Sequence, residues 1–298
     1  MTDEPTKPFN AANAARAASA PKRRRSLSYH TANVRNAIVT KLPDALLGGR
    51  LRARHVAQPI ELNEYALSSA HWPRAFDGVR IAHISDIHFG HLLGPERLAQ
   101  AVDAVRAVKP DLIAITGDLV DLSGDEAPLL FEHLSLLKAT LGVFIVLGNH
   151  DHLDQPRAIV RGARDAGLTA LVDESTRAGG RNGLLVAGID WSKSIPGCIA
   201  RLRRCGMARA DLLLAHNPKA FVGAVDREIP LTLSGHTHGG QVARRANRRH
   251  NLVFTQRLNA GHYQRGESHL YVTNGVGAWF PLRVNCPPEV AVIEMRTR

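Results

Sequence analysis

The sequence predicts an α/β fold in which two packed sheets form a sandwich with helices on the outside. Short apolar runs, mostly four to six residues long and often β-branched, alternate with helical patterns from about Val56 onward. Such alternation is typical of sheets covered by helices. The later runs lie closer together in the chain, so the sheets need not be purely parallel. An apolar content of 44% over 298 residues is enough to bury a sizeable core.

The strands are predicted from the apolar runs, which are short and lack helical periodicity. In chain order they are residues 79–84, 112–116, 143–147, 184–189, 212–215, 231–233, 270–273 and 290–293.

The helices between them are predicted from prolines, capping residues and leucine spacing. Pro95 begins one helix and Pro110 ends it. Leu130 and Leu134 mark a second. For a third helix, Asp154 is the predicted cap, Pro156 lies in the first turn and Gly167 lies just past the end. For a fourth, Asn217 is the predicted cap and Pro218 follows it.

Positive charge is concentrated at the N-terminus. Residues 1–55 carry 11 Lys or Arg and 3 Asp or Glu, a net +8 of the chain's +11. We therefore divide the chain into a basic, largely disordered arm (1–55) and a folded domain (56–298). Residues 1–30 are expected to be disordered. Residues 31–52 fit a short basic amphipathic helix around Val34, Ile38, Leu42 and Leu46, interrupted by Pro43; it is either solvated or rests on acidic lipid or nucleic acid.

The chain carries few signs of export. Residues 22–27 resemble the start of a twin-arginine signal, but the apolar run that such a signal needs does not follow. Three scattered cysteines suit reduced, structural thiols, and no apolar run approaches the length of a membrane helix. We expect a cytoplasmic protein, with peripheral contact at the inner membrane left open.

Polar residues follow five of the predicted strands directly. In α/β sheets ligands bind beyond the carboxyl ends of the strands, so these side chains are expected to share one rim. They are Asp86 and His88, then Asp118 and Asp121, then Asn149, His150 and Asp151, then His216, and finally His236 and His238.

This set of side chains predicts a metal centre. A single histidine or aspartate at a strand end is usually structural, but five such ends at once are not explained that way. Asp86 and His88 are one residue apart, so in extended chain both project to one side, and the same holds for His236 and His238. Mixed carboxylate, amide and imidazole ligands suit manganese, iron, zinc or nickel better than magnesium. Asp118 is able to bridge two ions.

The same residues form a series of motifs that resembles a known family, the calcineurin-like metallophosphoesterases, over about residues 75–295. The resemblance implies a four-layer α/β-β/α sandwich of two mixed sheets flanked by helices, the metallophosphatase fold. The motifs are Asp86-Ile87-His88, Gly117-Asp118-Leu119-Val120-Asp121, Gly148-Asn149-His150-Asp151, His216 and Gly235-His236-Thr237-His238, in the family's order.

The resemblance also implies a role for each site residue. Asp86, His88 and His238 would bind the first of two divalent ions. Asn149, His216 and His236 would bind the second, and Asp118 would bridge both. His150 would face the substrate as leaving-group acid or oxyanion stabiliser, and Asp151 would orient His150 through a hydrogen bond. The expected reaction is in-line attack on a phosphate ester by a metal-bridging hydroxide, with manganese the favoured metal.

A finer resemblance points to the membrane-associated branch of the family. It rests on His238-Gly239-Gly240-Gln241, residues 273–277 and residues 281–289. A phosphodiesterase is the favoured interpretation, and a pyrophosphohydrolase acting on a UDP-linked lipid precursor of lipid A or a non-catalytic phosphate-binding scaffold are the alternatives. Arg244 and Arg245, in a basic segment that reaches Arg265, are candidates for binding substrate or lipid phosphates. Leu252, Val253 and Phe254 in that segment suit a lipid-facing loop. An aromatic content of 5% argues against nucleic acid.

Overall fold

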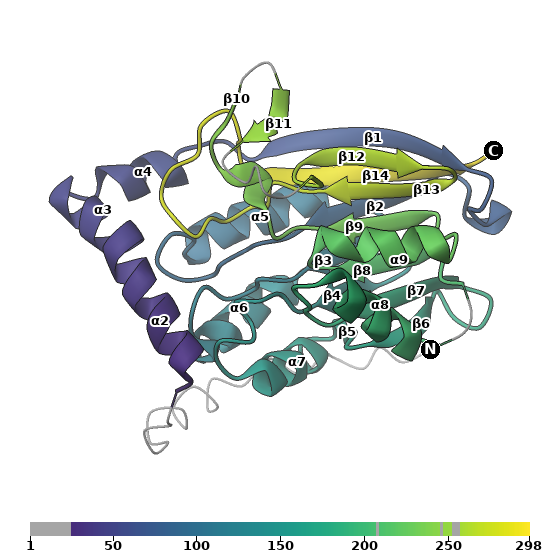
Figure 1. Ribbon diagram of the computed structural model, residues 1–298, viewed down its shortest axis with the longest axis horizontal. Helices are drawn as coiled ribbons and strands as arrows, with labels where there is room; N and C mark the ends of the chain where they lie inside the picture. Colours follow the sequence, from purple (N-terminus) through teal and green to yellow (C-terminus); the bar gives the residue numbers. More distant parts are fainter. Residues whose placement is uncertain (1–24, 207–208, 245–246, 252–256) are drawn as a thin grey trace, which may run out of the picture.

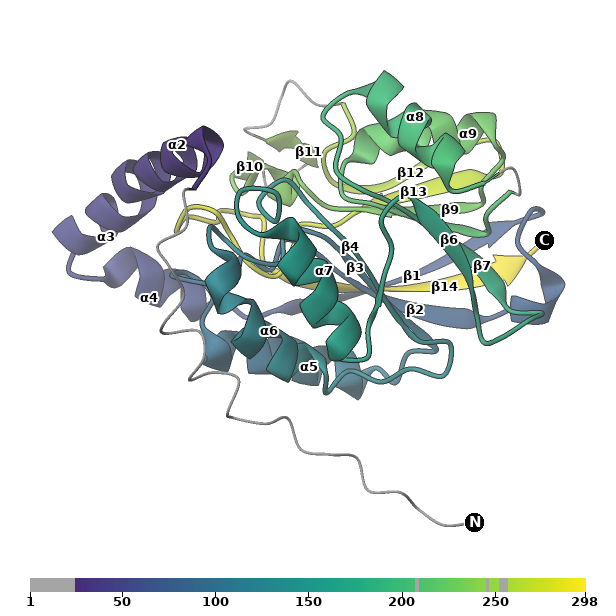
Figure 2. The same cartoon turned by 90° about the horizontal axis from the view of Figure 1, so that it is seen from below.

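The structure is a computed structural model that describes residues 25–206, 209–244, 247–251 and 257–298, with the backbone alone for 247–251. Figure 2 shows its four layers. Helices α5 to α7 lie on one side, helices α8 and α9 lie on the other, and two sheets lie between them. The predicted sandwich of two mixed sheets flanked by helices is therefore confirmed.

The first sheet holds six strands in the order β1-β14-β2-β3-β4-β5. Strands β2 to β5 are parallel, β14 is antiparallel to β2, and β1 runs parallel to β14 at the edge. Their bounds are β1 Glu61–Ser69, β2 Val79–Ile84, β3 Leu112–Thr116, β4 Val143–Val146, β5 Thr169–Ala170 and β14 Glu289–Thr297.

The second sheet also holds six strands, in the order β12-β13-β9-β8-β7-β6. Strands β7, β8, β9 and β13 are parallel, while the edge strands β6 and β12 are antiparallel to their neighbours. Their bounds are β6 Glu174–Ala178, β7 Leu184–Ile189, β8 Leu212–Ala215, β9 Leu231–Ser234, β12 Gly261–Arg265 and β13 Ser268–Val272. A separate hairpin pairs β10 (Ala243–Arg244) with β11 (Asn247–Asn251).

Three hydrophobic clusters hold the layers together. One joins the first sheet to α5 (Pro95–Ala107), α6 (Ala127–Leu134) and α7 (Pro156–Asp165). A second lies between the two sheets and includes Trp72, Phe144 and Tyr271. The third joins the second sheet to α8 (Ile195–Arg204) and α9 (Phe221–Asp226). Because each sheet is covered on both faces, its central strands are mostly apolar, which explains why the sequence shows short apolar runs.

All eight predicted strands are present, but several others escaped prediction. Strands β1 and β6 alternate exposed or half-buried residues, and β5 is only two residues long, so none of them has a buried apolar run. Helix α8 was also missed, although Ser194 caps it by accepting a hydrogen bond from the amide of Gly197.

One predicted helix cap is wrong. Helix α7 begins at Pro156 and ends before Gly167 as predicted, but its N-cap residue is Gln155, with a φ of 54° and no capping hydrogen bond from its side chain. The Asp154 carboxylate instead accepts from the Gly124 amide at 3.3 Å. The cap at Asn217 is confirmed, because its side chain accepts from the Lys219 amide at the start of a 3-10 turn (Pro218–Ala220) that leads into α9.

The residues before β1 form helices that lie against the domain (Figure 1). They are α2 (Leu27–Asn36), a π-helical segment (Ala37–Lys41), α3 (Leu42–Leu46) and α4 (Arg50–Val56). Helix α2 thus begins four residues before the predicted start at 31, because Ser26 caps it by accepting from the Tyr29 amide. Residues 1–24, expected to be disordered, lie outside the described residues. Within the described ranges, no helix is long and apolar enough to cross a membrane.

Candidate metal centre

The carboxyl ends of strands from both sheets meet at one rim, and every residue of the predicted metal site lies there. Two hydrogen bonds tie the sheets together at this point. His216 Nδ1, after β8, lies 2.7 Å from the Thr116 carbonyl oxygen of β3. The His236 amide, after β9, donates to the Asp86 carboxylate, after β2, at 3.0 Å. The predicted convergence of strand ends is therefore present, and it spans both sheets rather than one.

Four buried side chains form a close group at this rim. Ligand atoms of Asp86, His88, Asp118 and His238 all lie within 4.8 Å of one another. Asp118 Oδ2 is 3.5 Å from His88 Nε2, and Asp86 Oδ1 is 3.3 Å from His238 Nε2. The two Nε2 atoms of His88 and His238 are 3.1 Å apart. Ligand atoms this close together could hold a single cation.

A second group lies on the other side of Asp118. His216 Nε2 is 3.2 Å from Asp118 Oδ2. The rings of His216 and His236 are 5.1 Å apart and meet edge to face. Asp118 Oδ2 is therefore near an imidazole of each set, as a carboxylate shared by two ions would be.

The backbone at the rim is strained. Five non-glycine residues here have positive φ values near the left-handed region, which is uncommon for residues other than glycine. The prediction that the Asp-x-His and His-x-His pairs are extended is therefore wrong. The values are 51° for Asp86, 47° for His88, 50° for Asp118, 72° for His236 and 51° for His238. Strain of this kind persists where the surrounding structure enforces it, and it is concentrated at functional sites.

Two glycines make room for the carboxylates. A Cβ atom on Gly148 would overlap the Asp118 carboxylate, and one on Gly235 would overlap that of Asp86. A side chain at either position would push a carboxylate out of the site. Glycine at both positions therefore keeps the two carboxylates where a cation can reach them.

The electrostatics of the rim fit a cation. Burial alone would raise the pKa of Asp118, but His216, His150 and His88 outweigh burial and hold that pKa well below its usual value. Burial would lower the pKa of His216, but the Asp118 carboxylate raises it to about 9. Burial lowers the pKa of His236 to about 3, which favours the neutral form that binds metal.

Unsatisfied polar atoms support the same conclusion. Asn149 Oδ1 is buried without a hydrogen-bond partner among the described residues, and His216 Nε2, although 3.2 Å from Asp118 Oδ2, makes no hydrogen bond of normal geometry. A buried polar atom without a partner is costly, and such exceptions in a native protein need an explanation. An amide oxygen and an imidazole nitrogen are both good ligands for a transition metal, so the residues present fit the group that the sequence predicts.

The prediction that Asp151 forms a hydrogen bond with His150 is wrong. The Asp151 carboxylate accepts instead from the backbone amides of Leu119, Val120 and Gly148. His150 Nδ1 donates to the Asp121 carbonyl oxygen at 2.5 Å, because a carbonyl can only accept. This bond leaves His150 Nε2 as the atom able to face a substrate. Asp151 holds together the loops after β3 and β4, and burial raises its pKa to about 7.

Two residues support the site through contacts that the sequence did not predict. Asp121 lies in a predicted motif without a role, yet its Oδ1 is 3.4 Å from His88 Nδ1 and 3.7 Å from His150 Nδ1. Its Oδ2 accepts a hydrogen bond of 2.8 Å from Asn36 Nδ2. Asn36 belongs to α2, 85 residues away in the chain. Only folding brings the two together.

We expect Asn36→Leu to lower kcat by about tenfold with unchanged metal content. The substitution removes a buried donor to a charged acceptor, a loss of about 1–3 kcal/mol, and frees Asp121 beside both His88 and His150. Steady-state kinetics, metal analysis and urea unfolding would measure the effect. Asn33→Leu, at an exposed position of the same helix, is the matched control. Equal kinetics for the two variants would contradict the role of Asn36.

An ion pair and a tryptophan follow β7, whose end is not among the five strand ends predicted to form the site. The Trp191 ring lies 4.8 Å from the His236 ring and 5.6 Å from the His216 ring. Next to it, Asp190 Oδ1 is 2.6 Å from His152 Nε2. The pattern that identified the other five strand ends, an apolar run followed by polar side chains, applies to Ile189-Asp190 as well and would have identified this one.

The His152–Asp190 pair is expected to stabilise the fold most between about pH 4 and pH 6.5. The hydrogen bond to Asp190 raises the pKa of His152 above 6.5, so that contribution is present at lower pH and is lost as the pH rises through the raised pKa. Burial would raise the pKa of Asp190, but His152 outweighs it and lowers that pKa below 3.8, so that contribution is lost only in stronger acid.

We expect His152→Gln to cost at most about 1 kcal/mol near pH 5.5 and less above pH 8, because the side chain is about a third exposed and water screens the pair. Urea unfolding of both proteins across this range, with the exposed His30→Gln as control, measures the difference. A cost that grows with rising pH would contradict the pair.

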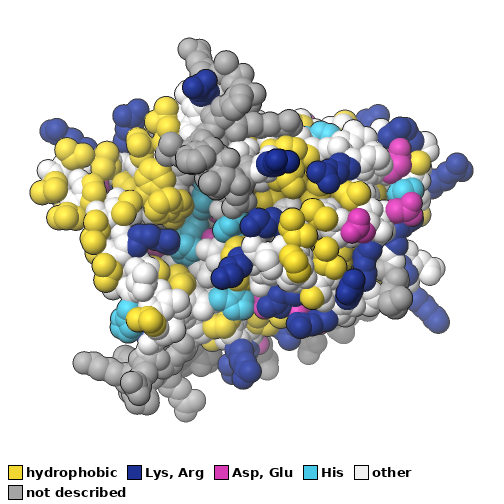
Figure 3. Space-filling view, in the orientation of Figure 1, with side chains coloured by type: hydrophobic (Ala, Val, Ile, Leu, Met, Phe, Trp, Pro, Cys, Tyr) yellow, Lys and Arg dark blue, Asp and Glu magenta, His cyan; other side chains and the backbone are white. Residues whose placement is uncertain are grey.

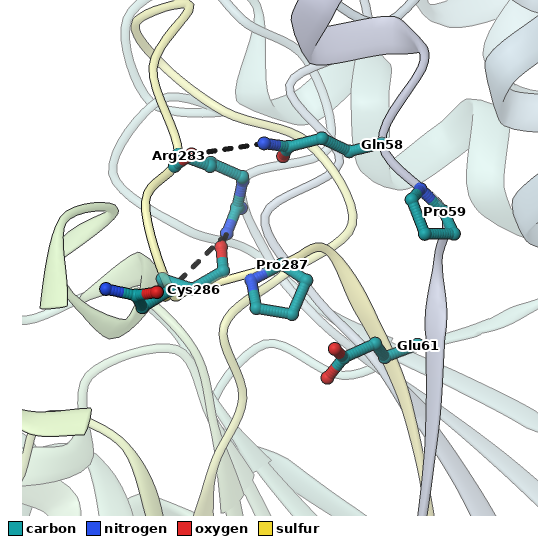
Figure 4. Close-up of a pocket in the computed structure, with 7 residues that line it drawn as sticks. Gln58, Pro59, Glu61, Arg283, Cys286 and Pro287 are labelled. Atoms are coloured by element: carbon teal, nitrogen blue, oxygen red, sulfur yellow. Dashed lines mark hydrogen bonds between the residues drawn. The ribbon is translucent and has the colours of Figure 1, made fainter. Parts of the chain in front are cut away.

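A buried arginine holds the loops behind the metal centre. The Arg283 guanidinium donates to the carbonyl oxygens of Cys286 and Asn274 at 3.0 and 2.8 Å. Figure 4 shows the first of these bonds, together with Gln58, whose Nε2 donates to the Arg283 carbonyl oxygen. The Cys286 thiol in turn donates to the His238 carbonyl oxygen at 3.0 Å. Arg283 also lines a pocket, together with Gln58, Pro59, Glu61, Asn285, Cys286 and Pro287.

The predicted substrate-binding arginines are only partly described. Arg244 is exposed in β10. Arg245 and the segment of Leu252, Val253 and Phe254 lie outside the described residues. Their role in binding stays a prediction.

Comparisons with known proteins agree with this geometry. The model of the calcineurin-like phosphoesterase family matches residues 79–240, the span from β2 to the turn after His238. An uncharacterized metallophosphoesterase of Bacillus subtilis, YkuE, is 30% identical over 84% of this chain and 91% of its own length. The phosphodiesterase YaeI of Escherichia coli is 32% identical over 72% of this chain and 82% of its own.

A third relative is longer than this chain. The uncharacterized metallophosphoesterase Cj0846 of Campylobacter jejuni is 30% identical over 75% of this chain. The match spans 61% of that relative's length.

Proposed function

The chain belongs to the calcineurin-like phosphoesterase family, and we propose that it hydrolyses phosphodiesters at a centre of two divalent transition-metal ions. Membership makes it a metal-dependent phosphoester hydrolase. The preference for diesters, the number of ions and the residue roles are part of the proposal. The observation that carries it is the group of four buried ligands, Asp86, His88, Asp118 and His238, within 4.8 Å of one another.

Each side chain has a place in this proposal. The ligands of the first ion are Asp86, His88 and His238, those of the second are Asn149, His216 and His236, and Asp118 is the bridge. The unsatisfied Asn149 Oδ1 and His216 Nε2 support the second set. When bound, the ions lower the pKa of water and offset the charge of the phosphate.

His150 is the proposed contact to the leaving group. Its Nδ1 proton is held by the Asp121 carbonyl oxygen, so Nε2 takes up and delivers the proton. Burial lowers the pKa of His150 below its usual value, and the Asp118 and Asp121 carboxylates offset only part of that shift. A bound phosphate would add negative charge beside the ring, which shifts the pKa of His150 back upward and favours the protonated form that the acid role needs.

The name of the YaeI relative, phosphodiesterase, favours diesters over monoesters. Hydrolysis of bis-p-nitrophenyl phosphate and of p-nitrophenyl phosphate by metal-stripped protein, with manganese, iron, zinc or nickel added back, tests the preference. We expect metal-dependent hydrolysis with the diester favoured. Faster hydrolysis of the monoester would overturn the diesterase proposal.

Inactivity on both compounds would favour one of the alternatives. With metal demonstrably bound, it would favour a pyrophosphohydrolase and direct the assay to UDP-linked lipids. Inactivity on those lipids too would leave the non-catalytic scaffold. Absence of bound metal would overturn the assignment of the centre itself.

A further inference from the structure

A helix on the surface of a soluble protein usually buries its apolar face and exposes its polar face. The N-terminal helices do the reverse. The residues packed against the domain are polar at every fourth position, Asn36, Thr40 and Asp44, and all three are buried. Asn36 donates to Asp121, and Thr40 donates to the Trp279 carbonyl oxygen at 2.9 Å. Tyr29 and Ala32 are also buried in α2, but from Asn36 onward these helices are held to the domain by hydrogen bonds rather than by an apolar face.

The apolar stripe points away from the domain. Its side chains are exposed by 57% at Val34, 59% at Ile38, 53% at Leu42 and 77% at Leu46. Leu27, Val39 and Leu47 extend it and are exposed as well. Figure 3 shows apolar side chains gathered over α2 to α4, at the left of the molecule. We call this set the outer apolar stripe. Large exposed apolar areas of this kind mark interaction sites.

The π-helical segment keeps the outer apolar stripe straight. Residues four apart drift by about 40° around an α-helix of 3.6 residues per turn. The π-helical turn at Ala37–Lys41, between α2 and α3, has more than four residues per turn. Residues four apart there fall short of a full turn, which offsets the drift in the α-helical parts. Positions 34, 38, 42 and 46 therefore stay on one side, and positions 36, 40 and 44 stay on the other.

Positive charge surrounds the stripe. Residues 25–56 contain six Lys or Arg and one Asp, a net charge of +5. Arg35, Lys41, Arg50, Arg52 and Arg54 are exposed, whereas the single acidic residue, Asp44, is buried on the other side. An apolar stripe edged by exposed basic side chains is the composition of helices that lie in the interface of an acidic membrane. A protein partner would need an acidic rim around an apolar groove, which is a more demanding match.

We propose that the outer apolar stripe docks this protein on a lipid bilayer that carries anionic headgroups. The apolar side chains enter the headgroup region, and the lysines and arginines around them contact the lipid phosphates. Helix α2 also supplies Asn36 to the Asp121 that supports the metal centre, so docking places the centre beside the lipid surface. The neighbouring loop adds Leu282 and Val284, each 36% exposed.

Co-sedimentation of the full-length protein with vesicles tests the proposal without any activity measurement. The vesicles contain phosphatidylcholine alone or phosphatidylcholine mixed with phosphatidylglycerol. We expect binding to the mixed vesicles that weakens with salt, and little binding to phosphatidylcholine alone. The triple variant Val34→Ser, Ile38→Ser, Leu42→Ser should bind at least about tenfold more weakly. Lys41→Gln with Arg50→Gln should also weaken binding by about tenfold or more.

A matched control removes apolar side chains elsewhere. Leu62, Leu136 and Ile195 are exposed by 49%, 54% and 39% and lie outside these helices. Their triple serine variant should bind vesicles as the unmodified protein does, and circular dichroism checks that all variants are folded. Failure of the unmodified protein to bind mixed vesicles would overturn the proposal. A second result would overturn it as well: an unmodified protein that binds no vesicles and sediments as a dimer, while the Val34→Ser, Ile38→Ser, Leu42→Ser variant sediments as a monomer. A second copy of the chain would then cover the stripe.

Discussion

Asp118→Ala is expected to release both metal ions and to slow phosphoester hydrolysis by at least about a thousandfold. The reason is the position of the carboxylate between the two sets of imidazoles. Asp118 Oδ2 lies 3.5 Å from His88 Nε2 and 3.2 Å from His216 Nε2, so one carboxylate oxygen is near an imidazole of each set. Elemental analysis of the purified protein and kcat/KM for bis-p-nitrophenyl phosphate measure the two effects.

Two further variants separate the metal effect from damage to the fold. Asp118 Oδ1 accepts from the His150 amide at 2.7 Å, and Asp118→Asn keeps an oxygen for that bond while it removes the charge. We expect Asp118→Asn to fold normally and still to bind metal weakly. Asp165→Asn, at an exposed position in α7, should behave as the unmodified protein does. Two ions retained in Asp118→Ala would contradict the bridging role.

His150→Ala is expected to keep its metal and to lower kcat by about a hundredfold or more, with the larger loss for poor leaving groups. Nε2 of His150 is the ring atom available to a substrate, because Nδ1 is bound to Asp121. An acid that protonates the leaving oxygen matters most when that oxygen is strongly basic. The measurement is kcat for a series of aryl and alkyl phosphodiesters, compared between the variant and the unmodified protein.

The leaving-group dependence decides between two roles of His150. An equal loss of kcat across the series would mean that His150 only binds phosphate, and the proposed acid role would be wrong. Asp151→Asn is informative beside it. This variant should lose stability rather than leaving-group sensitivity, because the Asp151 carboxylate binds the amides of Leu119, Val120 and Gly148.

Strands with both faces covered were predictable, and so were the residues that follow them. A buried strand such as β3, Leu112–Thr116, needs an apolar side chain at nearly every position, and this requirement is visible in a single sequence. Parallel strands present their carboxyl ends at one edge, so the chain positions of Asp118 and Asn149 are enough to place them at a common rim. Strands with an exposed face or two residues of length, such as β1 and β5, leave no such pattern.

The contacts of the site residues depend on the folded chain. The family resemblance implied that Asp151 orients His150, its neighbour in the chain. In the fold, Asp151 points to backbone amides, and the carbonyl oxygen of Asp121, from the loop after another strand, binds His150 instead. A hydrogen-bond partner is chosen by direction and distance, and neither follows from separation along the chain.

The N-terminal helices show the same division. Residue spacing predicts that Val34, Ile38, Leu42 and Leu46 lie near one another on a helix. The π-helical segment that keeps all four on one side is seen only in the structure. The positive charge around them is plain in the sequence. Which stripe faces the protein is settled by the folded domain. Asn36 and Thr40 find partners there, in the Asp121 carboxylate and the Trp279 carbonyl oxygen, so the polar stripe is buried and the apolar one is left outside. Helical periodicity defines two faces, but which face is buried depends on the partners that the rest of the fold provides.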